Sequence, residues 1–473
     1  MPGRSRHPLA ALSVIAAVPA LLFAAVVVYA NGRATVDVVA DTATPAVSVA
    51  PLRTPLLSVR RNPAVLSSDH RREVLTGALR TLSVEVDSSS CFAVGVNGRL
   101  LTGANTATSV IPASNLKVAV AAVALEVLGP GTVFDTTVTG PSPSGGVVQG
   151  DVHLVGGGDP VLSEGWYTQV TEWHKRPPIS PTGVEGLADA LVTAGVQRIT
   201  GSVLGVDGRY DDERHPPGWS DDIRRTIDGV PVGALVVNDS VSQTGAISAD
   251  PARHAANVLT RLLRDRGVVV EGEPGTGSAP DGTVQLATVT SQPLPALLNE
   301  MLATSDNLTA EMLVKEIGAR AGGAGTREAG LKVIGDTMAK WGIPLEGVEL
   351  HDGSGLSREN RLTCTTLLAV LQRGSAADPV GAGLARAGQD GSTLDGKFEQ
   401  PGLAGVLRAK TGSLREVKAL CGYFPAGGDE IAFVLVLNGP TAAGFETRWD
   451  ALGQALLAAA GSPAPDVLSP LRS

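Results

Sequence analysis

The stretch VIPASNLKVAVAAVALEVLG, residues 110–129, places a serine and a lysine three residues apart at the start of an apolar run. Ser114 and Lys117 would share one face of the helix that this run predicts, because residues i and i+3 are neighbours on a helix. A serine hydroxyl becomes a nucleophile when a base takes its proton, and burial lowers the pKa of a lysine towards that task. The pair indicates serine catalysis, although the spacing alone more often marks a capping serine and an exposed lysine.

A second short motif, Ser305-Asp306-Asn307, stands just before a predicted helix. Its serine and its asparagine, two residues apart on a turn, can project into one cleft. There they can relay a proton and hold a substrate carbonyl. Taken alone, the motif fits an ordinary helix cap equally well.

A third motif, Lys410-Thr411-Gly412, lies in a predicted strand and is followed by Ser413. The lysine adds positive charge to a cleft, and the threonine offers a hydroxyl to a substrate carboxylate. The glycine lets a substrate approach the backbone. A plain strand with a turn would explain this motif if it stood alone.

The three motifs occur once each and in this order, which is the signature of class A β-lactamases and penicillin-binding proteins. Three further features resemble more narrowly the type-4, or class C low-molecular-mass, penicillin-binding proteins, the D-alanyl-D-alanine carboxypeptidase/endopeptidases. They are DGSGLSR at 352–358, GQDGSTLDGKF at 388–398 and the long stretch between the first two motifs. The resemblance covers roughly residues 65–462 and implies a peptidase that trims peptidoglycan stem peptides and is acylated by β-lactam antibiotics.

The resemblance also implies a role for each motif residue. Ser114 attacks the penultimate D-alanine carbonyl, Lys117 accepts its proton, and the backbone N–H groups of Ser114 and Ser413 stabilise the oxyanion. No metal and no cofactor is needed. We expect residues 351–360 to be mainly a supporting turn rather than a source of catalytic groups. The implied catalytic residues are Ser114, Lys117, Ser305, Asn307 and Lys410, and the implied substrate-binding residues are Thr411, Gly412 and Ser413.

Three other functions share parts of this pattern. A β-lactamase carries the three motifs, but it lacks a long insertion after the nucleophile helix and needs a deacylating base, or a tyrosine where Ser305 stands. A non-catalytic wall-binding protein would be free to lose the motif side chains, and an esterase would have no use for the insertion. We therefore favour a D-Ala-D-Ala carboxypeptidase/endopeptidase, without choosing between its two activities.

The elements around these motifs predict an α+β fold, a transpeptidase-like domain whose antiparallel sheet is flanked by helices. Residues 66–132 and 291–462 would form this catalytic domain, and 133–290 a β-rich inserted region. Alternation around Asn97-Gly98 predicts a hairpin. Within the insertion, GALVVNDSVSQTGAISA, residues 233–249, is one of several predicted β pieces.

The two ends of the chain and its net charge indicate where the protein acts and which partners are excluded. Two arginines followed by an apolar run make residues 1–30 an export signal or membrane anchor, so the body would lie outside the cytoplasm. Residues 31–65 resemble a tether and 463–473 a mobile tail. A net charge of −9 argues against a nucleic-acid partner.

The three cysteines, Cys91, Cys364 and Cys421, show no CxxC spacing, so zinc and redox motifs are unsupported. An odd count permits at most one internal disulfide. We expect three buried thiols. Cys91 and Cys421 both lie in strand-like segments and could face each other across a sheet, but the sequence leaves the pairing open.

Overall fold

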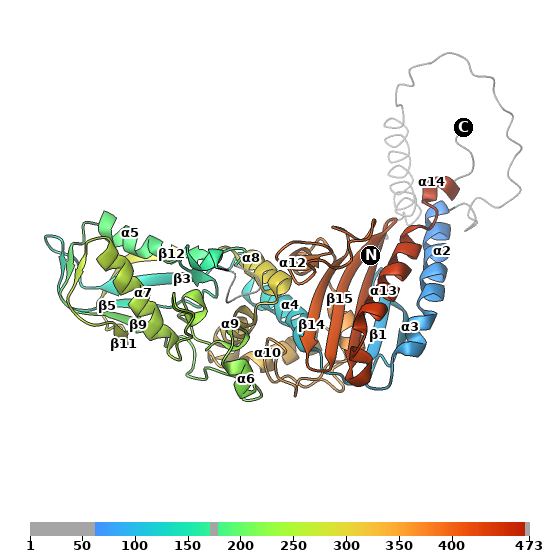
Figure 1. The fold of residues 1–473 in the computed structure, drawn as a ribbon, viewed down its shortest axis with the longest axis horizontal. Coiled ribbons are helices and arrows are strands. Elements are labelled where there is room, and N and C mark those ends of the chain that lie inside the picture. The colour runs from blue at the N-terminus through green and yellow to red at the C-terminus, as the bar shows by residue number, and fades with distance from the viewer. Residues whose placement is uncertain (1–61, 171–177, 469–473) are drawn as a thin grey trace, which may run out of the picture. The chain divides into compact units, whose positions relative to one another are not determined.

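The computed structural model describes residues 62–170 and 178–468 (Figure 1). The chain divides into two units, Met1–Ser58 and Val59–Ser473, and the described residues all belong to the second. The predicted export segment, residues 1–30, lies outside the described residues, as does nearly all of the predicted tether. Within the described part of the chain, every helix is too short or too polar to span a bilayer.

A six-stranded antiparallel sheet organises the unit, with the strand order β13-β14-β15-β16-β1-β2. The predicted hairpin is confirmed, since a two-residue turn at Asn97-Gly98, both with positive φ, joins β1 to β2. The strands are β1 Cys91–Val96, β2 Arg99–Ala104, β13 Ala385–Arg386, β14 Arg408–Leu414, β15 Val417–Ala426 and β16 Asp429–Asn438.

Helices cover both faces of this sheet, and alternate strand residues face each layer (Figure 1). Cys91 and Ala93 pack against the first group of helices, and Phe92 and Val94 against the second. The predicted α+β fold is therefore confirmed. The first group is α4 Leu116–Leu128, α8 Leu294–Asn299, α9 Asn307–Ile317, α10 Arg327–Lys340 and α11 Cys364–Leu371, and the second is α2 Pro63–Ala78, α3 Arg80–Glu85 and α13 Phe445–Ala460.

The stretch between α4 and α8 builds a separate hydrophobic core. Its main sheet has the order β11-β9-β5-β3-β12, and helices α5 Glu185–Thr193 and α7 Pro251–Asp265 pack against it. The strands are β3 Asp135–Gly140, β5 Val152–Val155, β9 Val203–Val206, β11 Gly275–Thr276 and β12 Val284–Thr290, and shorter elements include β4 Val147–Val148, β6 Leu162–Ser163, β7 Thr182–Gly183, β8 Arg198–Ile199, α6 Asp221–Arg224 and β10 Val269–Val270.

One predicted β piece of the insertion is wrong. Residues 233–249 form no strand, and Asn238–Ser240 form a 3₁₀ turn, η5, in which all three residues have positive φ. The buried Asn238 amide accepts from Glu164 N at 2.8 Å and donates to Glu164 Oε2 at 2.9 Å. The backbone bonds within a tight turn instead of a ladder, with Ser240 N donating to Val237 O at 2.9 Å and Val241 N to Asn238 O at 2.7 Å.

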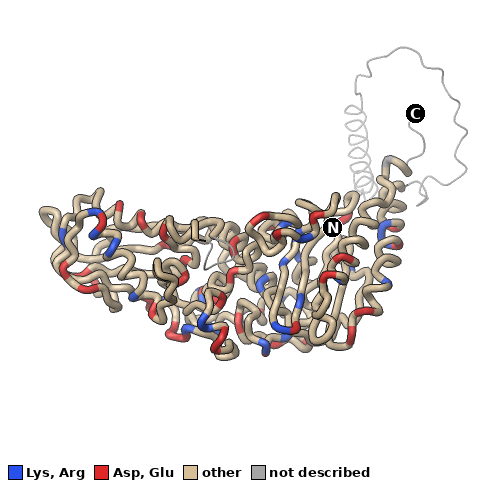
Figure 2. Tube along the Cα trace, in the orientation of Figure 1, with Lys and Arg blue, Asp and Glu red and all other residues tan. Residues whose placement is uncertain are grey.

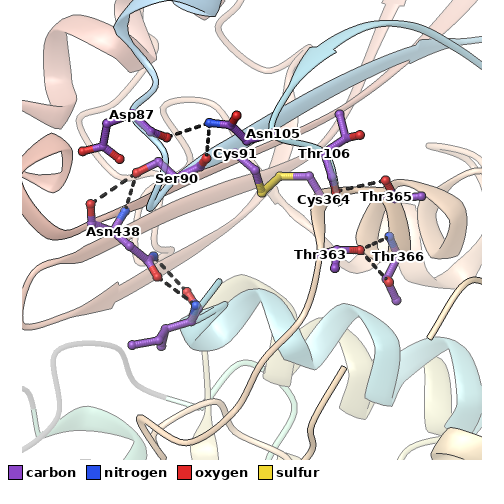
Figure 3. Close-up of a disulfide and its surroundings, with 11 residues drawn as sticks. Asp87, Ser90, Cys91, Asn105, Thr106, Thr363, Cys364, Thr365, Thr366 and Asn438 are labelled. Carbon is purple, nitrogen blue, oxygen red and sulfur yellow. Dashed lines mark hydrogen bonds between the residues drawn. A yellow bond between two sulfur atoms is a disulfide. The ribbon is translucent and has the colours of Figure 1, made fainter. Parts of the chain in front are cut away.

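The cysteine prediction is also wrong, because Cys91 and Cys364 form a disulfide between β1 and the first residue of α11 (Figure 3). Cys421 is a buried free thiol. A pairing of Cys91 with Cys421 is excluded because β16 lies between β1 and β15. Strands two places apart are about 9–10 Å from each other, beyond the reach of a disulfide.

Candidate active site

Among the residues that the structure describes, two lysine side chains are wholly buried, which is unusual for a charged residue. Acidic and basic residues are interspersed along the described trace (Figure 2), whereas Lys117 and Lys410 have 0% exposure. Both belong to the motifs that the sequence singles out. A buried ammonium must be held by hydrogen bonds, so the partners of these two lysines define the site.

Ser114 lies in a short 3₁₀ turn, η2 Ala113–Asn115, that leads directly into α4. One turn further, Lys117 points back so that its Nζ lies 3.0 Å from Ser114 Oγ. The surrounding face of α4 consists of alanine, valine and leucine and is packed into the core. The structure thus brings the predicted nucleophile and base into direct contact.

Two carbonyl oxygens from distant segments complete the surroundings of Lys117. Its Nζ donates to Asn307 Oδ1 at 2.7 Å and to the backbone oxygen of Ser354 at 2.6 Å. Burial lowers the pKa of Lys117 to about 8, against the opposing influence of nearby carboxylates, of which Asp306 is the strongest. A lysine with this pKa is neutral in a useful fraction near physiological pH.

The second motif lies at a left-handed turn. Ser305 has φ +70° and separates a π-helical segment, η6 Glu300–Thr304, from α9. Asp306 caps α9 by accepting from Thr309 N at 2.6 Å, so the middle residue of the motif serves as the helix cap. The Asn307 amide is fixed at both ends, because its Nδ2 also donates to Asp228 O at 2.9 Å.

The third motif lies on β14, beside the turn that carries Ser114. A Cβ atom on Gly412 would come within 3.1 Å of Ala113 Cβ and of Pro112 O, so glycine permits this approach. Lys410 Nζ donates to Thr411 O at 2.8 Å. Ser413 is exposed on the same strand and accepts from Lys418 Nζ at 3.2 Å.

The loop at 351–360 packs against the turn that carries Ser114. Asp352 accepts from Gly355 N at 2.8 Å, from Ser357 N at 2.6 Å and from Asn360 Nδ2 at 2.7 Å. A Cβ on Gly355, which has φ +82°, would lie 2.0 Å from Ala113 O and 3.0 Å from Ser114 N. These contacts support the predicted architectural role of the loop.

Sequence reasoning missed two side chains that hold this loop. Glu311 accepts from Gly353 N at 3.0 Å and from Ser354 N at 2.7 Å, and burial raises its pKa to about 7. Trp219, from the insertion, donates to Asp352 Oδ2 at 2.9 Å. Glu311 could have been noticed as an acid one turn after Asn307 on an otherwise buried helix. Nothing in the local sequence marks Trp219.

The fold of the described chain is the one seen in penicillin-binding proteins. The solved penicillin binding protein 4 of Haemophilus influenzae superposes with a TM-score of 0.65 at 21% sequence identity, over 81% of this chain and 98% of that chain. A D-alanyl-D-alanine carboxypeptidase of Actinomadura sp. (strain R39) is 33% identical over 425 residues, covering 75% of this chain and 78% of that protein.

A carboxypeptidase of Mycobacterium tuberculosis is 30% identical over 347 residues, covering 69% of this chain and 71% of that protein. The profile of the D-Ala-D-Ala carboxypeptidase 3 (S13) family matches residues 94–248 and 233–458. The chain belongs to this family of peptidases. Membership favours the peptidase over the β-lactamase, the wall-binding protein and the esterase.

Proposed function

We propose that this chain hydrolyses D-alanyl-D-alanine stem peptides of peptidoglycan through an acyl-enzyme on Ser114. The observation that carries the proposal is the wholly buried Lys117 nitrogen, 3.0 Å from Ser114 Oγ. Its lowered pKa makes a neutral lysine available to take the serine proton. Membership of the S13 peptidase family supports the choice of substrate.

The two carbonyl partners of Lys117 orient it as a base. A neutral amine has two N–H groups and one lone pair. If the N–H groups donate to Asn307 Oδ1 and Ser354 O, the lone pair faces Ser114 Oγ. The proton then passes from Ser114 to Lys117 as the oxygen attacks the penultimate D-alanine carbonyl.

The remaining motif residues act on the tetrahedral intermediate. The backbone N–H groups of Ser114 and Ser413 stabilise its oxyanion, because Gly412 allows η2 to approach β14 closely. Ser305, with Lys410, passes a proton to the leaving D-alanine. Water then hydrolyses the acyl-serine. Asn307 orients the acyl chain, and Thr411 and Ser413 bind the terminal carboxylate.

The same serine would be acylated by β-lactams, as the solved complex of the Haemophilus influenzae protein with a β-lactam illustrates for a protein of this fold. We place the enzyme outside the cytoplasm, attached through residues 1–30 if that segment is not cleaved. The Cys91–Cys364 disulfide supports this location, because structural disulfides persist in oxidising compartments.

Mass spectrometry of the purified chain after incubation with benzylpenicillin tests the proposal. We expect one persistent adduct, mapped to Ser114, and none on the Ser114→Ala variant. In parallel, release of D-alanine from a D-Ala-D-Ala peptide should disappear in the same variant.

Two results would argue against this function. A short-lived adduct with rapid loss of penicillin would indicate a β-lactamase. If a folded protein forms no adduct, the chain would be a non-catalytic binding module.

A further inference from the structure

A third lysine lies next to the proposed carboxylate site but outside the three motifs. Lys418, the second residue of β15, stands directly opposite Ser413 of β14 in the antiparallel ladder. Its Nζ lies 3.2 Å from Ser413 Oγ and 4.8 Å from the centre of the Phe445 ring. The residue is half-buried, and its hydrogen bond to Ser413 is exposed to solvent.

Within the described part of the chain, no salt bridge includes Lys418. Its ammonium is instead held by a hydroxyl and by an aromatic face, the latter a cation–π contact. A hollow of about 530 Å³ borders it, lined by the exposed Glu416, by the start of β15 and by the 3₁₀ turn η8 Gly439–Ala442. An anion from solution can therefore reach this cation.

We propose that Lys418 is a further substrate-binding residue, whose ammonium holds the carboxylate of the C-terminal D-alanine together with the Ser413 hydroxyl. This inference rests on the proposed function, which assigns Ser413 to that carboxylate. An anion that accepts a hydrogen bond from Ser413 Oγ would also lie close to Lys418 Nζ, because that nitrogen is 3.2 Å from the same oxygen. Charge-assisted hydrogen bonds of this kind are roughly twice as strong as neutral ones.

The consequence is selectivity for a free carboxylate at the end of the peptide. A substrate whose terminal carboxylate is replaced by an amide loses the attraction to Lys418 but keeps the hydrogen bond to Ser413. Because the side chain is partly exposed, the effect is modest and weakens with salt, whose screening length falls to about 3 Å at 1 M.

The test compares Lys418→Gln with the wild-type full chain on two peptides that differ only at the end, D-Ala-D-Ala and D-Ala-D-alaninamide. We expect kcat/KM of the variant to fall about tenfold on the carboxylate peptide, mostly through KM, and to change less than twofold on the amide. The deficit should shrink in 1 M NaCl. Lys418→Arg should retain most of the wild-type activity.

Lys332→Gln is the matched control, because Lys332 is an exposed lysine on α10 that pairs with Asp336. This variant should behave as wild type on both peptides. An equal loss on the two peptides in Lys418→Gln would show a structural role through the Phe445 contact and overturn the proposal. So would an unchanged kcat/KM on the carboxylate peptide.

Failure of the proposed function would look different. In that case the wild type itself would not release D-alanine, and benzylpenicillin would leave Ser114 unmodified. The ratio between the two peptides, measured on a wild type that turns over, reports on Lys418 alone.

Discussion

At the scale of single residues, the chemistry depends on how completely Lys117 is buried. An exposed lysine has a pKa near 10.4 and would be protonated at neutral pH. Here an apolar helix face removes water, while Asn307 and Ser354 satisfy the N–H groups without supplying a full negative charge. The nearby carboxylates keep the pKa from falling further. The balance leaves a base suited to mildly alkaline conditions.

This balance predicts a specific pH dependence. The neutral form of Lys117 is required, and its pKa is lowered to about 8, so the rate of acylation should rise with pH and reach half its maximum near pH 8. The measurement is kcat/KM for benzylpenicillin acylation between pH 6 and pH 10. Lys117→Arg, which cannot deprotonate, should lose about 10²–10⁴-fold and show no such rise. A flat wild-type profile would contradict the role of Lys117 as base.

At the scale of elements, α9 links two parts of the site. Its first residue, Asn307, contacts Lys117 directly, and one turn later Glu311 holds the loop whose Ser354 oxygen contacts the same amine. The helix therefore fixes both carbonyl partners of the base. Its far end is fixed separately, because Glu316 accepts from Arg209 at 2.6 and 2.8 Å.

Glu311→Gln should consequently impair catalysis. The amide keeps at most one acceptor oxygen, and its NH₂ group would face the Gly353 N–H. We expect kcat/KM for acylation to fall about tenfold, together with a loss of about 1–3 kcal/mol in the free energy of unfolding.

The matched control is Glu316→Gln, at a wholly buried acid of the same helix outside the site. It should cost similar stability while leaving the acylation rate unchanged. If the two variants lost activity equally, the effect would lie in folding and not in the position of Ser354.

At the scale of the whole described unit, long-range links join segments that are far apart in the sequence. The insertion is joined to α9 by Arg209–Glu316 and Lys315–Asp211, and to α10 by Arg327–Glu213. On the other side of the site, the Cys91–Cys364 disulfide joins segments 273 residues apart. Figure 3 shows Asn438 hydrogen-bonded to Ser90, the residue before Cys91. The Asn438 side chain accepts from Ile111 N at 2.8 Å, just before the Ser114 turn.

Removing the disulfide should lower stability. A bridge that closes so long a loop constrains the unfolded chain, and its loss typically costs about 2–5 kcal/mol. Cys91→Ala with Cys364→Ala should therefore have a lower Tm by calorimetry. Dithiothreitol should lower the Tm of the wild type and leave that of the double variant unchanged. A double variant whose Tm is unchanged from that of the untreated wild type would contradict a stabilising bridge.

The sequence by itself determined the parts that local pattern encodes. Ser114 and Lys117 are three residues apart on an apolar helix, Asn97-Gly98 specifies a turn, and the order of strand-like and helix-like segments indicates a sheet flanked by helices. Motif order was enough to indicate the family. The helix, the turn and the strands follow from spacing within a few residues, and the motif order can be read directly along the sequence.

Only the tertiary structure decided which distant groups meet. The fold brings to the site three groups from distant segments, which are Ser354 O, Glu311 and Trp219. Strand order separates Cys91 from Cys421, and Cys91 pairs with Cys364 instead. Such contacts depend on packing between separate elements, and no local periodicity specifies their partners.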